Sequence, residues 1–234
     1  MATLLQTLIL LGTGIVLGLE HALETDHIVA VVTLTSQTKS VRRAVLLGVS
    51  WGLGHALTLI VIGFIILVTR LVIPEQIALL LEMLVGVVLI GLGIDTAWKA
   101  LKGDLHYHTH EHDGVQHTHL HSHHHTHDHA HHTRRSFLVG VVHGLAGSAA
   151  LVLLVVSTFD SVGSGVAFIV CFGLGSVIGM ALIQHSADRA VQTDVKFERL
   201  NSAIRVATGS LSVVVGAALI YNIGFVEGLF LRGA

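Results

Sequence analysis

Residues 43–69 read RAVLLGVSWGLGHALTLIVIGFIILVT, and this stretch decides the class of fold. After its first residue it contains no Asp, Glu, Lys or Arg, and it is long enough for the roughly 20 apolar residues that a membrane-crossing α-helix needs. Across the whole chain, 52% of the 234 residues are hydrophobic and only 12% are charged. The chain is therefore expected to be an all-α, multi-pass membrane protein.

Similar apolar windows predict six transmembrane helices, at about residues 8–36, 43–69, 75–98, 136–159, 162–187 and 206–226. Of the 13 Lys and Arg residues, all but Arg70 and Arg232 fall on one side of this arrangement. By the positive-inside rule, both chain ends face outward and the long loop after the third helix is cytoplasmic. The expected location is the cytoplasmic (inner) membrane.

The two halves of the chain resemble each other. His21-Ala-Leu-Glu-Thr-Asp-His aligns with His143-Gly-Leu-Ala-Gly-Ser-Ala, and Trp51-Gly-Leu-Gly-His aligns with Phe172-Gly-Leu-Gly-Ser in nearly the same register. Three helices per half is an odd number, so the halves have opposite topology, as in many secondary transporters. The sequence thus predicts a first three-helix repeat (1–101), a cytoplasmic His-rich loop (102–135) and a second three-helix repeat (136–234).

Ionisable side chains inside the predicted helices are the strongest functional signal. In hydrocarbon such a group costs several kcal/mol, so it generally marks a pathway for an ion or a proton. Imidazole and carboxylate ligands suit Ni²⁺, Co²⁺ and Zn²⁺, and the lack of thiolate ligands disfavours Cu⁺. The predicted metal ligands are His21, Asp26, His27, His55 and His143, and weaker candidates for metal or proton binding are Glu24 and Glu82.

The spacing of the first motif raises a geometric problem. At about 100° per residue, His21 and His27 lie roughly 120° apart on a straight helix, so one ion cannot easily bind both. Either the helix is unwound near residues 21–27, which would also expose backbone ligands, or one histidine does not bind the ion itself and contacts a residue that does. The sequence leaves both arrangements open.

The loop at residues 106–132 holds 14 of the 19 histidines. It has no apolar periodicity, so we expect it to be disordered when metal-free. Its imidazoles are mostly neutral near pH 7 and can bind metal transiently. The loop histidines assigned to metal binding are His121, His123, His124, His125, His127, His129, His131 and His132.

The motif His21-x4-Asp26-His27 resembles the signature of the nickel/cobalt transporter family, and Leu53-Gly54-His55 is similar to an element on that family's next helix. The family usually has Asp at position 24 and Ser or Thr at position 56, where this chain has Glu and Ala. The His-rich loop resembles that of the nickel/cobalt efflux branch of the same superfamily. The resemblance implies Ni²⁺ or Co²⁺ as substrate and a ligand role for His21, Asp26, His27 and His55.

We therefore expect a secondary transporter of divalent metal, Ni²⁺ or Co²⁺, and not an enzyme. A net charge of −2 gives no reason to expect a nucleic-acid partner, and no permanently bound cofactor is expected. The partners are the lipid bilayer and metal ions, while homo-oligomerisation and contact with nickel-enzyme maturation proteins stay open. The alternatives are a zinc transporter and a membrane accessory or storage protein that supplies nickel to a metalloenzyme.

Replacing residues 106–132 by a flexible linker should preserve the membrane fold and transport at saturating metal. Degenerate, mobile histidines cannot hold one selective geometry without a large entropy cost, so they act by raising the local metal concentration. Flux measured from each face of oriented vesicles should show a changed apparent affinity for cytoplasmic metal if the protein exports, or changed retention if it imports. Loss of maximal flux from both faces would contradict this role.

Overall fold

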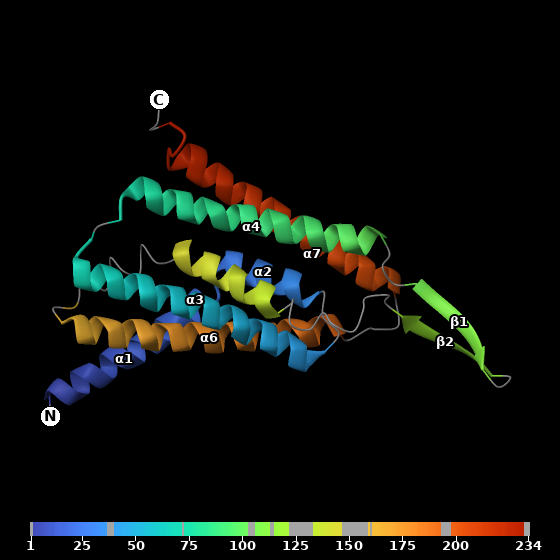
Figure 1. Cartoon of the computed structure of the whole chain (residues 1–234), viewed down its shortest axis with the longest axis horizontal. Helices are drawn as coiled ribbons and strands as arrows, with labels where there is room; N and C mark the ends of the chain where they lie inside the picture. The colour runs from blue at the N-terminus through green and yellow to red at the C-terminus, as the bar shows by residue number, and fades with distance from the viewer. Residues whose placement is uncertain are drawn as a thin grey trace.

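The computed structural model of the chain describes residues 2–36, 40–71, 73–102, 106–112, 115–121, 133–146, 159, 161–192 and 198–231. Its long helices are α1 (Ala2–His21), α2 (Thr25–Thr35), α3 (Val41–Thr69), α4 (Glu75–Lys102), α6 (Val162–Gln192) and α7 (Glu198–Tyr221). A short π-helix, η1 (Asn222–Val226), continues α7. Residues 133–146 are also helical, and the strands β1 (His106–His112) and β2 (Val115–His121) precede them (Figure 1).

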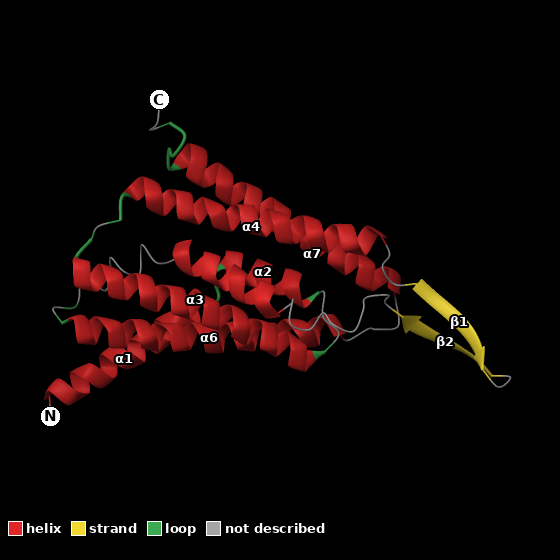
Figure 2. Ribbon diagram, in the orientation of Figure 1, coloured by secondary structure: helices red, strands yellow, loops and turns green. Residues whose placement is uncertain are grey.

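Four helical segments are long and apolar enough to cross a membrane: Val41–Thr69, Glu75–Lys102, Val162–Ala187 and Ser202–Val226. The bent pair of α1 and α2 makes a fifth if it counts as one span. All these spans are helical (Figure 2), which confirms the all-α, multi-pass membrane class. The predicted window at 136–159 is helical up to residue 146, and most of its remainder lies outside the described residues.

The first span is broken between His21 and Thr25. The amide N–H of Leu23 donates to the Glu20 carbonyl oxygen (2.9 Å) and that of Glu24 to the His21 carbonyl oxygen (3.1 Å), which are tighter turns than those of an α-helix. Glu24 then adopts an extended backbone, with φ −61° and ψ 150°. The two halves of the span meet at 60°. Of the two arrangements that the sequence left open, the structure has the unwound helix.

The helices form two groups that α2 joins. α3 and α1 both pack along α6, while α4 packs along α7, and α2 contacts α4, α6 and α7. Figure 1 shows α2 between the α4–α7 pair and the α3–α6 pair. The buried apolar cluster beside α2 includes Ala30, Val31, Trp51, Leu89, Val139 and Met180. The short helix therefore lies at the centre of the fold.

The strands β1 and β2 form an antiparallel hairpin in which His106 pairs with His121 and His112 with Val115. We expected no regular structure in this loop, and over these two strands that expectation is corrected. Pairing gives the facing backbone N–H and C=O groups of the two segments hydrogen-bond partners. Residues 122–132 lie outside the described residues, and the boundaries of the three predicted parts stay predictions.

Gly93 of α4 and Gly209 of α7 lie against each other. A Cβ on Gly209 would stand 2.7 Å from the Gly93 carbonyl oxygen, and a Cβ on Gly93 would overlap the Gly209 carbonyl oxygen. Gly93→Ala should therefore push α4 away from α7 and destabilise the fold by about 1–3 kcal/mol. The measurement is the thermal-unfolding midpoint of the detergent-solubilised protein.

Gly91→Ala is the matched control on the same helix. A Cβ on Gly91 would meet nothing within 4 Å, so this variant should keep or slightly raise the midpoint, because Ala favours helix over Gly. Equal midpoints for the two variants would contradict the close α4–α7 approach.

Candidate metal centre

The broken first span brings His21 and His27 together. His21 ends α1 and His27 lies in the first turn of α2, and their ring centroids are 4.6 Å apart. His55, from the middle of α3, has its ring 5.1 Å from that of His21 and 5.5 Å from that of His27. One ring nitrogen from each of the three histidines lies within 4.8 Å of the other two. Three imidazoles from three helices therefore converge on one point.

Four ring nitrogens of this cluster are buried and have no hydrogen-bond partner among the described residues. His27 is 2% exposed and His55 is fully buried. Nε2 of His21, Nε2 of His27 and both ring nitrogens of His55 make no hydrogen bond. A buried polar atom left unpaired costs about 1–3 kcal/mol, so several at one point are typical of a binding site. Neutral imidazole nitrogens carry a lone pair that divalent transition metals bind.

Two carboxylates fix the orientation of two of these rings. Nδ1 of His21 lies 2.8 Å from Oε1 of Glu24, and Nδ1 of His27 lies 3.1 Å from Oδ1 of Asp26. An ionised carboxylate only accepts, so each Nδ1–H donates and each Nε2 keeps a free lone pair. Metal-binding histidines are commonly held by carboxylates in this way. Glu24, Asp26 and His27 also have ligand atoms within 4.8 Å of one another, so the carboxylates are close enough to bind an ion directly.

His143 lies near the second oxygen of the Asp26 carboxylate. Its Nδ1–H donates to the Val139 carbonyl oxygen at 3.3 Å, and its Nε2 is 3.7 Å from Oδ2 of Asp26. The His143 ring is 5.1 Å from the His27 ring, but it is not part of the three-imidazole group. The two oxygens of Asp26 thus face two imidazoles, and because the Nδ1–H of neutral His143 points to Val139, its Nε2 faces Asp26 without donating a hydrogen bond.

The sequence prediction missed the aromatic side chains beside the cluster. Trp51 is fully buried, and its ring lies nearly parallel to that of His27, with an interplanar angle of 14° and a centroid distance of 5.7 Å. It also meets His143 edge-on at 5.1 Å, and Phe172 lies 5.3 Å from His21. The signal was available, because Trp51 precedes His55 by four residues and so lies on the same face of the helix.

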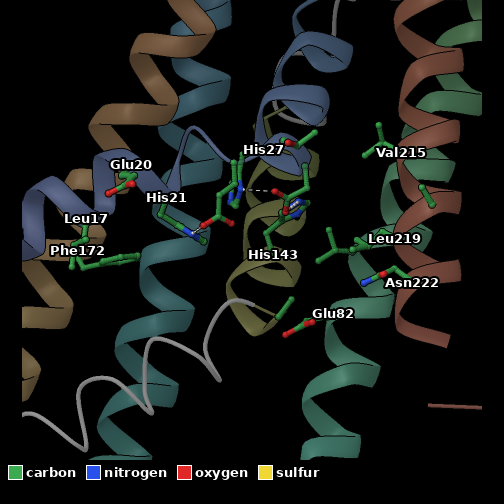
Figure 3. A pocket seen from close by; sticks show the side chains of 16 residues that line it. Leu17, Glu20, His21, His27, Glu82, His143, Phe172, Val215, Leu219 and Asn222 are labelled. Carbon is green, nitrogen blue, oxygen red and sulfur yellow. Dashed lines mark hydrogen bonds and ion pairs between the residues drawn. The ribbon is translucent and has the colours of Figure 1, made fainter. Parts of the chain in front are cut away.

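A cavity of about 970 Å³ borders the cluster. Figure 3 shows His27 and His143 on one side of it and Glu82, Leu219 and Asn222 on the other. Its polar lining residues are Glu20, His21, Glu24, Thr25, Asp26, His27, Glu82, His143 and Asn222. Glu82, predicted as a weaker candidate, thus faces the same space as the imidazoles without joining them.

Of the eight loop histidines assigned to metal binding, one lies in the described part of the chain. His121 ends β2. The remaining seven predicted loop ligands lie outside the described residues: His123, His124, His125, His127, His129, His131 and His132. Metal binding by the loop stays a prediction.

Comparison with known proteins now places the chain in a family. The model of the cytochrome c biogenesis protein transmembrane region matches residues 27–218, and the chain belongs to this family of membrane proteins. It is also 38% identical to the urease accessory protein UreH of Bacillus sp. (strain TB-90), over 221 residues that make up 94% of each protein. No solved structure matches the chain.

The predicted membership of the nickel/cobalt transporter family is wrong, because the match over residues 27–218 is to another family. That resemblance depended on a few ligand-type residues within the first two spans. Such residues recur in unrelated proteins because metal chemistry needs the same side chains, whereas the family match covers most of the chain. The family's name does not by itself assign cytochrome c biogenesis to this chain, because function depends on the site and not on the fold.

Trp51→Ala should destabilise the protein by about 3–5 kcal/mol, because it leaves a void beside two rings that the site needs. The control is Trp98→Ala, since Trp98 is 58% exposed and its recorded ring contact is Lys102 Nζ at 4.6 Å. That change should cost less than about 1 kcal/mol. Chemical unfolding in detergent, followed by circular dichroism, measures both, and a similar cost for the two variants would contradict the packing role of Trp51.

Proposed function

We propose that this chain is a membrane accessory protein that binds Ni²⁺ and passes it across the membrane for urease maturation. The observation that carries the proposal is the buried group of His21, His27 and His55, whose lone pairs converge without a hydrogen-bond partner. A protein that only needed packing at this point would be more stable with apolar side chains, because each unpaired nitrogen costs free energy. Metal binding repays that cost.

The similarity to a urease accessory protein selects nickel among the metals that the ligands suit. Imidazole and carboxylate bind Ni²⁺, Co²⁺ and Zn²⁺ alike, so the ligand set alone does not distinguish them. Urease requires nickel, and a membrane protein related to one of its accessory proteins has an evident use for a nickel site. Zinc is the second candidate, since three imidazoles also form common catalytic zinc sites.

Two inverted repeats would explain how the site forms at the middle of the membrane. Gly18 of α1 lies against the Phe172 carbonyl, and Gly140 lies against the Trp51 carbonyl. The sequence alignment of the halves pairs Gly18 with Gly140 and Trp51 with Phe172, so the two contacts exchange partners as a two-fold axis requires. This symmetry supports the proposed repeat, with the ion bound between the halves. The proposal keeps the chain ends outside and the His-rich loop in the cytoplasm.

Metal binding can be followed through the fluorescence of Trp51. The chain has two tryptophans, so the Trp98→Phe variant keeps Trp51 alone. In this background Ni²⁺ and Co²⁺, which have open d shells, should quench its fluorescence, whereas Zn²⁺ should compete without quenching. His27→Ala and His55→Ala should each weaken Ni²⁺ binding by more than about 100-fold, because each removes a ligand from a site with few others.

His185→Ala is the control, because His185 lies further along α6 and has no ring contact with the described cluster. It should bind Ni²⁺ like the parent. In proteoliposomes, His27→Ala and Asp26→Ala should abolish Ni²⁺ flux at normal protein abundance, and His143→Ala should be milder. Binding without flux in the parent would identify a storage or delivery protein, and no binding at all would overturn the proposal.

A further inference from the structure

Glu82 places a carboxylate within one of the candidate membrane spans. It lies on α4, roughly 10 Å along the helix from Glu75 at the helix start. No hydrogen bond or ion pair joins Glu82 to another described residue. The charge that acts on its carboxylate is the like charge of Glu227. A carboxylate in this setting is costly, which indicates that it meets a cation.

Glu82 lines the cavity that leads to the imidazoles. The same cavity is bordered by His27 and His143, each 2% exposed and each with an Nε2 that makes no hydrogen bond. Asn222, on the π-helix at the end of α7, lines the cavity too and donates its Nδ2–H to Oε1 of Glu227 at 2.7 Å. π-helical turns occur often at functional sites. Glu82 and Asn222 therefore place side-chain oxygen atoms across the cavity from His27 and His143.

The position of this oxygen group gives the route a direction. In Figure 1 the start of α4 and the end of α7 lie at the end of the molecule opposite the β1–β2 hairpin. The residues that line the cavity include Glu82, in the first third of α4, and Asn222, just after the end of α7, and among the described residues none of β1 or β2 lines it. The cavity therefore extends from the imidazoles toward the end of the molecule that lies away from the hairpin.

We infer that Glu82 is an acquisition site for a hydrated divalent cation, reached before the imidazole cluster and from the face opposite the hairpin. The inference rests on the proposed function, because the cation must be the one that the imidazoles bind. Glu82 attracts the ion together with its water shell. The bound cation then offsets the repulsion between the carboxylates of Glu82 and Glu227. The imidazoles then replace water ligands, and the softer nitrogen ligands hold the ion.

Stopped-flow mixing with NiCl₂ tests the inference, with quenching of Trp51 in the Trp98→Phe background as the signal. Glu82→Gln should slow association roughly tenfold at low ionic strength, because the steering charge is lost. The final quench at saturating Ni²⁺ should not change. Glu82→Asp keeps the charge and should restore most of the rate. The difference between the parent and Glu82→Gln should shrink as salt is added.

Glu75→Gln is the matched control, because Glu75 is an exposed carboxylate on the same helix that does not line the cavity. Its association rate should stay within twofold of the parent. If Glu82→Gln associates as fast as Glu75→Gln, the acquisition site is overturned while the imidazole site stands. If the parent shows no quenching by Ni²⁺, the proposed function fails, and this inference fails with it.

The face from which the cation enters can be measured separately by cysteine labelling. The chain has a single cysteine, Cys171, so one substitution removes the background. In a Cys171→Ser background, Ala218→Cys places a thiol on the cavity wall. A membrane-impermeant thiol reagent should label it from the face opposite the hairpin, and Ni²⁺ should slow the labelling. Labelling only from the hairpin face would overturn the proposed direction.

Discussion

The structure depends on the break in the first span between His21 and Thr25. A continuous helix would point His21 and His27 in directions about 120° apart. The break turns the chain by 60° and brings the two rings to 4.6 Å, while it leaves Glu24 beside His21 and Asp26 beside His27. The unpaired backbone groups of such a break are tolerated within a membrane only where protein or a cavity surrounds them. The helices around α2 and the adjacent cavity provide that setting.

Close helix packing is the second condition for the site. Gly140 and Gly144 bring the 133–146 helix against the backbone of α3 at Trp51 and His55. This contact sets the level of His143 relative to the other imidazoles. Larger side chains at either glycine would separate the two helices and move His143 away from Asp26. The glycines therefore control the geometry of ionisable groups that they do not touch directly.

The family result separates fold from chemistry. The chain belongs to the family of the cytochrome c biogenesis transmembrane region and has only one cysteine, so it cannot form a disulfide within itself. Its membrane-embedded reactive groups are imidazoles and carboxylates instead. The chain is similar to a urease accessory protein, and these side chains are of the kinds that bind divalent transition metals.

The sequence by itself determined the membrane class, the position of the described spans and the residues that form the cluster. Apolar length and the cost of burying ionisable groups are local properties, and they can be read along the chain. Only the tertiary structure decided that His21, His27 and His55 share one point, that His143 faces Asp26, and that Trp51 and Glu82 border the same region. Those relations depend on where a helix bends and how closely its neighbours pack. The hydropathy of the sequence specifies neither the bend nor the packing distance.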